Sequence, residues 1–490
     1  MTDDASQQGG ANLPWQIEAN GINVVAEADR SGRLRDLFWI WFAANIGILA
    51  VLYGAIILSF GLNFAQGVAV ALLGSLSFIL VGIFSVSGRD GGVPMLTLSR
   101  AIFGPVGNLL PTAVSWLSLV GWEAISVITG TLAMMALLGS YWKTGTVALA
   151  LISMIIVAGL VVALGLLGQA TLVLVQTWAS YIFGALTLLV AIFLVSGTHW
   201  TVLLTKPMGP WLTGFVPALT IIIAGTGLSW ANASADYSRY MPRHSSTWGI
   251  VWSTTLGALI PVSLLMMVGL LLATREPTLA TSANPIAVIQ GALPGWMAAP
   301  FLITAVVGLI VEGDLSLYSS GLNLLNMFVP LERYKTVVID GAIMIVGTVY
   351  VVLVARNFFG PFESFLLLLG VGLAAWAGIF LSDQAFLRSR LGGYHPELLY
   401  DPNLSLGLIQ RGWNPAAVTA WIVGVVVALL FTVSPFFQGP LATGIFATSS
   451  LELLIAFVVS GLIFTIWSLL PGSQHDREPT IATGPPTALR

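Results

Sequence analysis

Cysteine is absent from the 490-residue chain, and charged residues are scarce, at 8% of the total. Without thiols, the chain cannot form disulfides, use a cysteine nucleophile or bind zinc through cysteine. Soluble domains carry about 25% charged residues, and a chain that is 57% apolar cannot cover itself with polar side chains. Lipid must therefore surround it, which predicts an integral membrane protein.

Motifs for metal binding, catalysis and nucleic-acid recognition are also missing. The sequence has no H-E-x-x-H pair, no nucleophile elbow and no basic patch interleaved with aromatic residues. We therefore expect no cofactor, no metal, no nucleic-acid partner and no enzymatic active site. The four histidines are scattered without the spacing of metal ligands: His199, His244, His395 and His475.

Long apolar stretches fill most of the chain between two polar ends, residues 1–36 and 471–490. The first of these ends lacks the pattern of a signal peptide, and we expect both to be tails. A membrane-spanning helix needs about 20 apolar residues, and 104–138 is long enough to include an entry segment or a tilt. This predicts an all-α protein with about twelve spans: 37–60, 64–84, 104–138, 146–166, 171–196, 215–237, 249–273, 298–325, 336–355, 359–382, 415–436 and 447–470.

Lysine and arginine are distributed unevenly between the two sides of this predicted bundle. Of the 18 Lys and Arg residues, all but four fall in the tails and in the connections on the same side as the tails. Connections rich in these residues stay in the cytoplasm. We therefore expect a multi-pass protein of the cell membrane with both termini cytoplasmic. The four exceptions are Lys143, Lys206, Arg275 and Arg356.

Two of the predicted spans contain sequences that interrupt a helix. Span one holds Ala43–Gly47, and span six holds Ala224–Asn232 with two glycines and several small polar residues. Small residues can simply allow close helix packing. However, the two segments occupy equivalent places in two five-helix halves, 37–196 and 215–382. Paired interruptions of this kind are typical of inverted-repeat transporters, whose binding site lies at the midplane.

Two carboxyl groups lie in the middle of span eight. Glu312 and Asp314 have no Lys or Arg near them in the sequence. Residues two apart on a helix point about 200° apart, so one can face a cavity and the other a neighbouring helix. A carboxylate held in a low dielectric can exchange a proton near neutral pH. These residues are candidates for ion coupling, and the alternative is a structural, hydrogen-bonded carboxyl.

Several short segments resemble the nucleobase–cation symporter family 1, the purine–cytosine permeases. The resemblance extends in order over roughly residues 37–385. It is carried by Leu37–Phe42, Ser87–Pro94, Ser99–Gly104, Gly121–Ser126, Ala235–Pro242 and Leu317–Leu322, of which Ala235–Pro242 is the most specific. The resemblance implies a leucine-transporter-like fold of two inverted five-helix repeats plus two extra helices, here 415–470.

The resemblance also implies a planar heterocycle held between spans one, three, six and eight. Trp122 matches a stacking tryptophan, and Ser126 matches a polar position that contacts substrate. The unwound part of span six would add backbone contacts. The substrate-binding residues we expect are Trp122, Ser126, Asn45, Gly47, Gly225, Gly227, Trp230 and Gly313.

The sequence departs from the family pattern in span eight. Members that bind purines or cytosine often carry Asn, or Asn and Asp, where this chain has Glu312–Asp314. An acidic site suits the N–H donors of cytosine or adenine, and it also suits a cationic ring such as thiamine. Sodium-coupled relatives pair span-one carbonyls, here Ala43 and Ile46, with span-eight hydroxyls. The side chain of Val311 offers no oxygen ligand, which favours protons over sodium, although sodium bound by Glu312 stays open.

These observations predict a secondary active transporter that imports cytosine, a purine or a related planar heterocycle by proton symport. Its partners would be the heterocycle, the coupling cation and the lipid bilayer. An alternative is sodium-coupled transport of thiamine, uracil, allantoin or a hydantoin. Alternatives from other classes are a channel, a non-transporting receptor and an intramembrane enzyme, and the sequence offers no filter or catalytic motif for the first and last of these.

Overall fold

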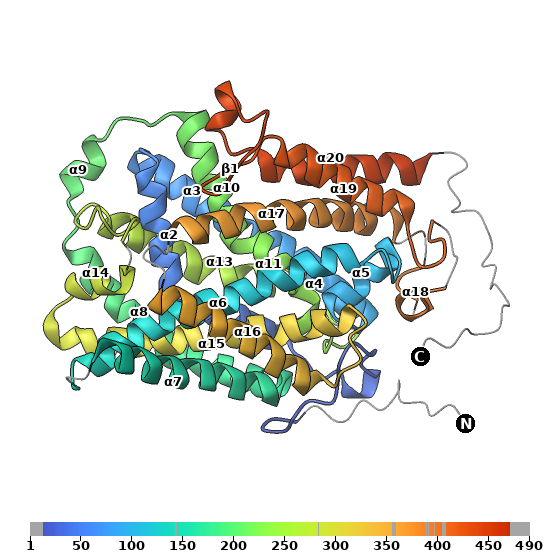
Figure 1. Ribbon diagram of the computed structural model, residues 1–490, viewed down its shortest axis with the longest axis horizontal. Coiled ribbons are helices and arrows are strands. Elements are labelled where there is room, and N and C mark those ends of the chain that lie inside the picture. Colours follow the sequence, from blue (N-terminus) through green and yellow to red (C-terminus); the bar gives the residue numbers. More distant parts are fainter. Residues whose placement is uncertain are drawn as a thin grey trace.

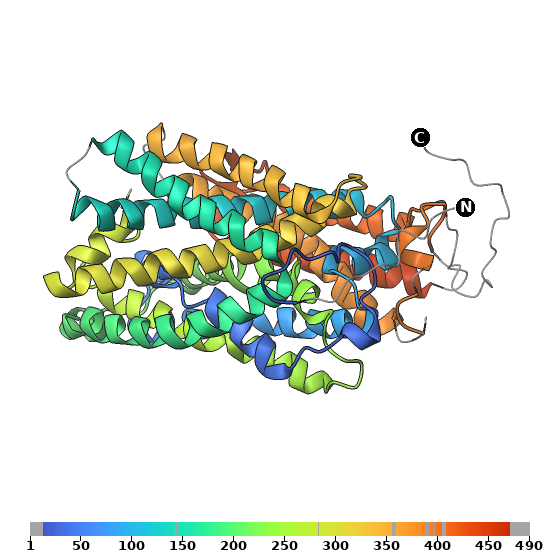
Figure 2. The same ribbon diagram turned by 90° about the horizontal axis from the view of Figure 1, so that it is seen from below.

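Long helices run side by side along one axis of the molecule (Figure 1), and the perpendicular view shows that they form a bundle several layers deep (Figure 2). The computed structural model describes residues 13–142, 145–282, 284–354, 359–388, 390, 392–395, 397–403 and 408–470. Helices α5 (Met95–Phe103) and α18 (Glu397–Tyr400) lie at one end of the bundle, and α9 (Trp200–Thr205) and α14 (Pro285–Gly291) lie at the other. We call these the α5 end and the α9 end.

Ten helical segments of the described residues are long and apolar enough to cross a membrane. Side chains such as Ile155 and Val346, each 70% exposed, cover the outside of the bundle, as expected for a surface that faces lipid. The ten segments contain α3 (Phe64–Leu76) with α4 (Phe78–Gly91), α6 (Leu109–Gly139), α7 (Thr146–Leu167), α8 (Gln169–Ser196), α10 (Val216–Ile223) with α11 (Ser229–Ala231), α13 (Thr247–Leu272), α15 (Ala298–Asn326), α16 (Arg333–Leu353), α17 (Phe359–Ser382) and α20 (Glu452–Leu469).

A bent pair of helices, α1 (Leu34–Ala44) and α2 (Ile48–Ser59), brings the number of candidate spans among the described residues to eleven. The twelfth predicted span is α19 (Pro415–Leu429), which is shorter than expected. It ends early because the chain turns into a small hairpin, β1 (Val433–Ser434) with β2 (Phe437–Gln438), around Pro435. The long stretch 104–138 is not divided: α6 covers most of it as one helix, and α5 is a separate short helix that precedes the stretch.

The first predicted interruption is a true break in the helix. α1 ends at Ala44, α2 begins at Ile48, and the two axes differ by 60°. Asn45 caps α1 and donates from Nδ2 to the carbonyl of Trp41 at 2.8 Å. The chain passes through Gly47, the N-cap of α2. A short polar side chain and a glycine therefore supply the local bonds and the space that this break requires.

The second predicted interruption is also present. A π-helical turn at Ala224–Leu228 separates α10 from α11, and Thr226 there has non-helical angles (φ −123°, ψ −110°). Its hydroxyl donates to the carbonyl of Ile222 at 2.5 Å. A further short helix, α12 (Ser234–Ser238), follows α11. Tyr53 of α2 donates to the carbonyl of Gly225 at 3.1 Å, so the two breaks lie against each other.

The helices around the breaks fall into two groups. The first helix group, α1 to α4 with α12 and α13, packs mainly on itself. The second helix group consists of α6, α7, α15 and α16, which also pack mainly on one another. α8 contacts both groups, and α17 packs on α19 and α20. The broken helices and α15 thus meet along the boundary between the two groups.

The polar N-terminal segment packs closely against the α5 end. Glu18 is 5% exposed and Asn20 is 1% exposed. Val25 donates to the carbonyl of Gly92 at 2.8 Å, and Arg30 donates to the carbonyl of Arg89 at 2.8 Å. The composition of this segment predicts only a polar tail. The difference arises because a few of its polar side chains find buried partners far along the chain.

Candidate functional site

A cavity lies where the two helix breaks meet. It is lined from both helix groups, by Ala44, Asn45, Gly47, Leu49, Ala50 and Tyr53 of the first broken helix, Trp122 of α6, Gly225, Thr226 and Trp230 of the second broken helix, Val262 of α13 and Glu312 of α15.

Aromatic rings form part of the cavity wall. Trp122 and Trp230 are 3% and 4% exposed, so packing fixes both indoles. Phe365 meets Trp122 edge-on at 5.9 Å between ring centroids, and Trp41 meets Trp230 edge-on at 5.6 Å. Edge-to-face contacts of this kind set the plane of a ring. The cavity is therefore bordered by indoles held in a defined orientation, which suits a flat, apolar-faced solute.

Glu312 supplies the carboxyl group of this cavity. Of the described residues that line it, Glu312 alone carries a carboxyl. A Cβ atom added to Gly47 would lie 3.2 Å from Glu312 Oε2, so the glycine at the first break leaves room for this side chain. Gly47 is also the N-cap of α2, and the N-terminal end of a helix favours negative charge. The site can thus hold a carboxylate and bind a proton or a donor group.

Asp314 points away from the cavity, as the helical spacing predicts for one member of the pair. It is 1% exposed, and neither of its carboxyl oxygens has a hydrogen-bond partner in the described part of the chain. It lies near enough to Tyr237 and Arg333 to interact with them electrostatically. Any role of Asp314 in coupling would therefore be exerted from behind the cavity wall.

The structure brings six of the predicted residues to the cavity: Asn45, Gly47, Trp122, Gly225, Trp230 and Glu312. Ser126 and Gly313 instead face each other between α6 and α15, where a Cβ on Gly313 would lie 3.5 Å from that of Ser126. Gly227 donates to the hydroxyl of Ser77 at 3.0 Å. The roles predicted for these three residues as substrate contacts stay predictions.

The predicted ion ligands of span one are separated by the break. Ile46 lines a second, apolar hollow next to the cavity. Ala43 packs with Ala179 and Val311 in a small apolar cluster. The carbonyl of Val311 accepts a hydrogen bond from Gln176 Nε2 at 3.0 Å. No group of three or more metal-ligating side chains occurs among the residues that the structure describes.

Several residues of the cavity wall were not predicted from the sequence. Tyr53 lies in an apolar helix, where nothing in the sequence distinguishes it from a packing residue. Its contact with Gly225 depends on the two breaks meeting in space. Thr226 was within the interrupted segment and could have been selected as its polar member. Val262, Leu49 and Ala50 complete the wall without any sequence signal.

Residues 24–473 match the family model described as a permease for cytosine/purines, uracil, thiamine, allantoin. The chain belongs to this family. It is 26% identical to the putative purine-cytosine permease YxlA of Bacillus subtilis (strain 168), over 92% of this chain and 96% of that protein. It is 24% identical to the purine-cytosine permease FCY2 of Saccharomyces cerevisiae, over 77% of this chain and 73% of that protein.

Solved structures resemble most of the chain. Mhp1, a nucleobase-cation-symport-1 family transporter, in a closed conformation with bromovinylhydantoin bound, superposes with a TM-score of 0.70 at 18% identity, covering 94% of each chain. A Na⁺-coupled sialic acid symporter superposes with a TM-score of 0.62 at 12% identity, covering 90% of this chain and 91% of that one. The predicted family and the leucine-transporter-like fold are confirmed. This permease is a multi-pass membrane transporter and not an enzyme.

Proposed function

We propose that this permease imports cytosine or a purine by proton symport, with the base held in the cavity at the two helix breaks. The observation that carries the proposal is the cavity lining, which combines two fixed indoles with a single carboxyl. Trp122 and Trp230 offer flat faces for a planar ring, and Glu312 offers acceptors for its amino and ring N–H groups. The relatives named as purine-cytosine permeases support this choice of substrate.

Proton coupling is supported by the surroundings of the two candidate cation positions. A sodium ion needs several oxygen ligands. The Ala43–Val311 region offers an apolar cluster, and the carbonyl of Val311 already accepts a bond from Gln176. Glu312 lies in the cavity beside Gly47 and can take up and release a proton there. We therefore assign proton binding to Glu312.

Transport would proceed by alternating access, in which one helix group moves against the other around the site. The apolar hollow beside the cavity shares Gly47 with it and is lined by Val51, Leu194 and Phe301, among others. Leu194 lies at the end of α8 and Phe301 at the start of α15, which are the α9 ends of these helices. We propose that this hollow is the entry path for the base.

Uptake measurements in cells that express the full chain test the proposal. Radiolabelled cytosine, adenine, hypoxanthine, uracil and thiamine are compared with and without a proton uncoupler and with and without sodium. Accumulation of cytosine or a purine that collapses with the uncoupler and ignores sodium is expected. Sodium-dependent uptake would overturn the coupling assignment. Uptake of thiamine alone would overturn the substrate assignment and would point to charge recognition by Glu312.

A further inference from the structure

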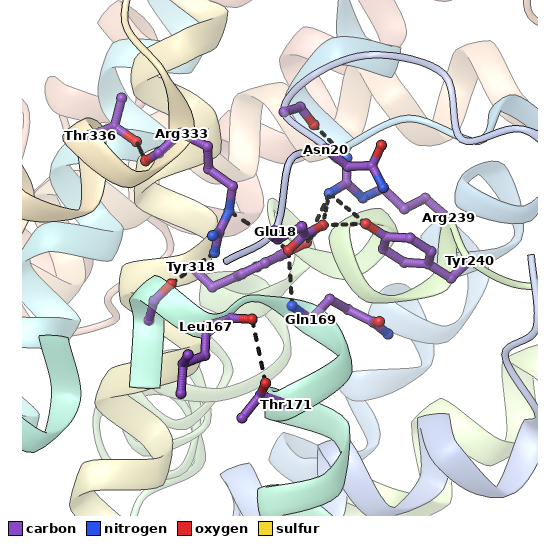
Figure 3. A network of polar contacts seen from close by, with 12 residues as sticks. Glu18, Asn20, Leu167, Gln169, Thr171, Arg239, Tyr240, Tyr318, Arg333 and Thr336 are labelled. Carbon is purple, nitrogen blue, oxygen red and sulfur yellow. Dashed lines mark hydrogen bonds and ion pairs between the residues drawn. The ribbon is translucent and has the colours of Figure 1, made fainter. Parts of the chain in front are cut away.

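A buried cluster at the α5 end joins the N-terminal segment to both helix groups (Figure 3). We call it the Glu18 cluster; it consists of Glu18, Arg239, Tyr240, Tyr318 and Arg333. The side chains of Glu18, Arg239 and Arg333 are each 2% exposed or less. Burying charged side chains is costly unless they are paired. The Glu18 cluster is therefore expected to be stable only while its charged groups stay paired.

The carboxylate of Glu18 is held through both of its oxygens. Oε1 accepts hydrogen bonds from Arg239 Nη2 at 3.1 Å, from Tyr318 at 3.2 Å and from Tyr240. Oε2 accepts the backbone N–H of Gln169 at 2.9 Å and lies 3.7 Å from Arg333 Nε. Figure 3 shows these groups converging on Glu18 from separate segments of the chain.

The backbone at the start of α8 is shaped to receive this carboxylate. Gln169 is the first residue of α8, so its N–H belongs to the positive end of a long helix. Gly168 before it has φ +77°, and a Cβ atom there would run into the Glu18 side chain. Glycine at this position thus provides both the left-handed turn and the space. Glu18 caps α8 from a segment 151 residues away in the sequence.

The partners of Glu18 belong to helix groups that must separate during alternating access. Arg239 follows α12, which packs on α4 in the first helix group. Arg333 begins α16 in the second helix group and donates to the carbonyl of Gly165 in α7 at 2.9 Å. Glu18 therefore bridges the boundary between the groups, and it belongs to neither of them.

The charges make this bridge asymmetric. The Glu18 cluster contains two guanidinium groups, one on each helix group, and a single carboxylate between them. Without the carboxylate, the two guanidinium groups would lose the partner that they share and would repel each other in a poorly solvated site. Asp314 interacts with Arg333 and Asp236 with Arg239, but neither carboxyl forms an ion pair with both arginines. Removal of Glu18 should therefore favour separation of the two groups at this end.

We propose that Glu18 is a lock that holds the α5 end of the pathway closed by joining Arg239 to Arg333, and that the N-terminal segment must release it before this end opens. Neighbouring contacts keep the segment in place for this role. Trp15 donates its backbone N–H to the hydroxyl of Thr171 in α8 at 2.8 Å, and Arg239 Nη1 donates to the carbonyl of Gly21 at 2.6 Å.

The lack of cysteine permits a direct test by thiol labelling of the full chain in lipid nanodiscs. Ser319 is fully buried on α15 and lies 2.9 Å from the hydroxyl of Tyr237, at the boundary between the two groups. Thr304 lies on the same helix and lines the hollow toward the α9 end. The variants Ser319→Cys and Thr304→Cys therefore report the opening of each end to N-ethylmaleimide.

Adding Glu18→Gln should raise the labelling rate of the Ser319→Cys variant about tenfold, since a buried ion pair loses one partner. The same change should lower the labelling rate of the Thr304→Cys variant, because one end closes as the other opens. An unchanged rate at position 319 would overturn the proposal. So would a rise at position 319 without a fall at position 304, because that result indicates local detachment of the segment.

Two further variants separate the lock from a general loss of structure. Glu27→Gln removes another carboxylate of the same segment, which is 54% exposed and pairs with Arg30 and Arg243, and it should change neither rate. Arg333→Gln added to Glu18→Gln removes the like-charge repulsion and should slow labelling at position 319 again. Continued fast labelling in this double variant would overturn the electrostatic account.

The proposed lock rests on the alternating access of the proposed function. The labelling test uses no substrate and no ion gradient, so its outcome is independent of which solute or cation is carried. Failure of all uptake assays together with the expected labelling changes would overturn the substrate assignment and support the lock. Unchanged labelling with normal proton-driven uptake would overturn the lock alone.

Discussion

Trp122 is the side chain on which binding of a planar base should depend most. Stacking of a base on an aromatic ring contributes about 1–3 kcal/mol, and about 1.4 kcal/mol corresponds to a factor of ten. We expect Trp122→Ala to lower uptake of the transported base about tenfold or more while the protein still inserts. Radiolabel uptake, normalised to the amount of protein in the membrane, measures this change.

Trp178 provides the matched control for this prediction. It lies on α8 and is 60% exposed, on a surface that we expect to face lipid. Trp178→Ala should leave uptake within about a factor of two, since surface substitutions typically change stability by less than about 0.5 kcal/mol. Equal losses in the two variants would mean that Trp122 acts through general stability and would remove its stacking role.

Substitution of Glu312 should separate binding of the base from coupling to protons. Glu312→Gln keeps the size of the side chain and one carbonyl acceptor, but it cannot take up a proton. We expect it to abolish accumulation against a gradient while exchange of labelled for unlabelled base continues. Counterflow measured in proteoliposomes distinguishes the two. Uncoupler-sensitive accumulation by the variant would exclude Glu312 as the proton-binding group.

These two residues could be selected from the sequence because each is unusual in its span. A carboxyl inside an apolar helix is costly and therefore informative, and Trp122 belongs to a segment that resembles the family. The sequence could not place Ser126 or Gly313, because their orientation depends on how α6 packs on α15. Tyr53 carried no signal, since its partner, the carbonyl of Gly225, is 172 residues away.

At the scale of helices, close packing of α2 on α13 holds the first broken helix in place. A Cβ atom on Gly54 would lie 2.9 Å from the backbone carbon of Gly269, and one on Gly269 would lie 3.0 Å from the Cα of Val51. Backbone atoms at these distances cannot move aside independently. Small residues on both helices therefore set their separation, as is common between membrane helices.

Gly54→Ala should consequently destabilise the protein by about 1–3 kcal/mol, the usual cost of overpacking. Thermal unfolding of the purified protein, compared with the parent chain, measures this. Gly159 on α7 provides the control, because a Cβ atom there meets nothing within 4 Å. Gly159→Ala should leave the melting temperature unchanged or raise it, since alanine favours helix. A lower melting temperature for both variants would contradict the packing argument.

The breaks in the two helices were predictable because they depend on local chemistry. Glycine and short polar side chains inside an apolar stretch weaken the helix and satisfy the freed backbone groups. The end of α19 was predicted less well. The window 415–436 is mostly apolar, but the helix ends at Leu429 and the chain then turns into the hairpin around Pro435. Hydropathy alone does not register such a turn.

At the scale of the whole molecule, the N-terminal segment is the part that the sequence revealed least. Its composition is that of a polar tail, and Glu18 carries no local signal. Its burial depends on Arg239 and Arg333, which lie more than 200 residues further along the chain. Pairing at this range is invisible to composition and periodicity. It becomes apparent only when the fold brings the start of α8, the end of α12 and the start of α16 together.

Orientation in the membrane is the last whole-molecule property that the sequence predicts. Arginines such as Arg30, Arg89 and Arg243 gather at the α5 end with the N-terminal segment. Positive connections are retained in the cytoplasm, so the α5 end should be cytoplasmic and the α9 end external. The base would then enter through the hollow at the α9 end and leave past Glu18.

Cysteine labelling in intact cells tests this orientation. His244→Cys places a thiol on an exposed connection at the α5 end, and Thr205→Cys places one on exposed helix α9. A membrane-impermeant maleimide should label the Thr205→Cys variant in intact cells and the His244→Cys variant only after lysis. The reverse pattern would mean that the α5 end is external. The proposed entry path would then be an exit. It would also place the Glu18 lock at the external end of the pathway, so that its release would admit the base instead of discharging it.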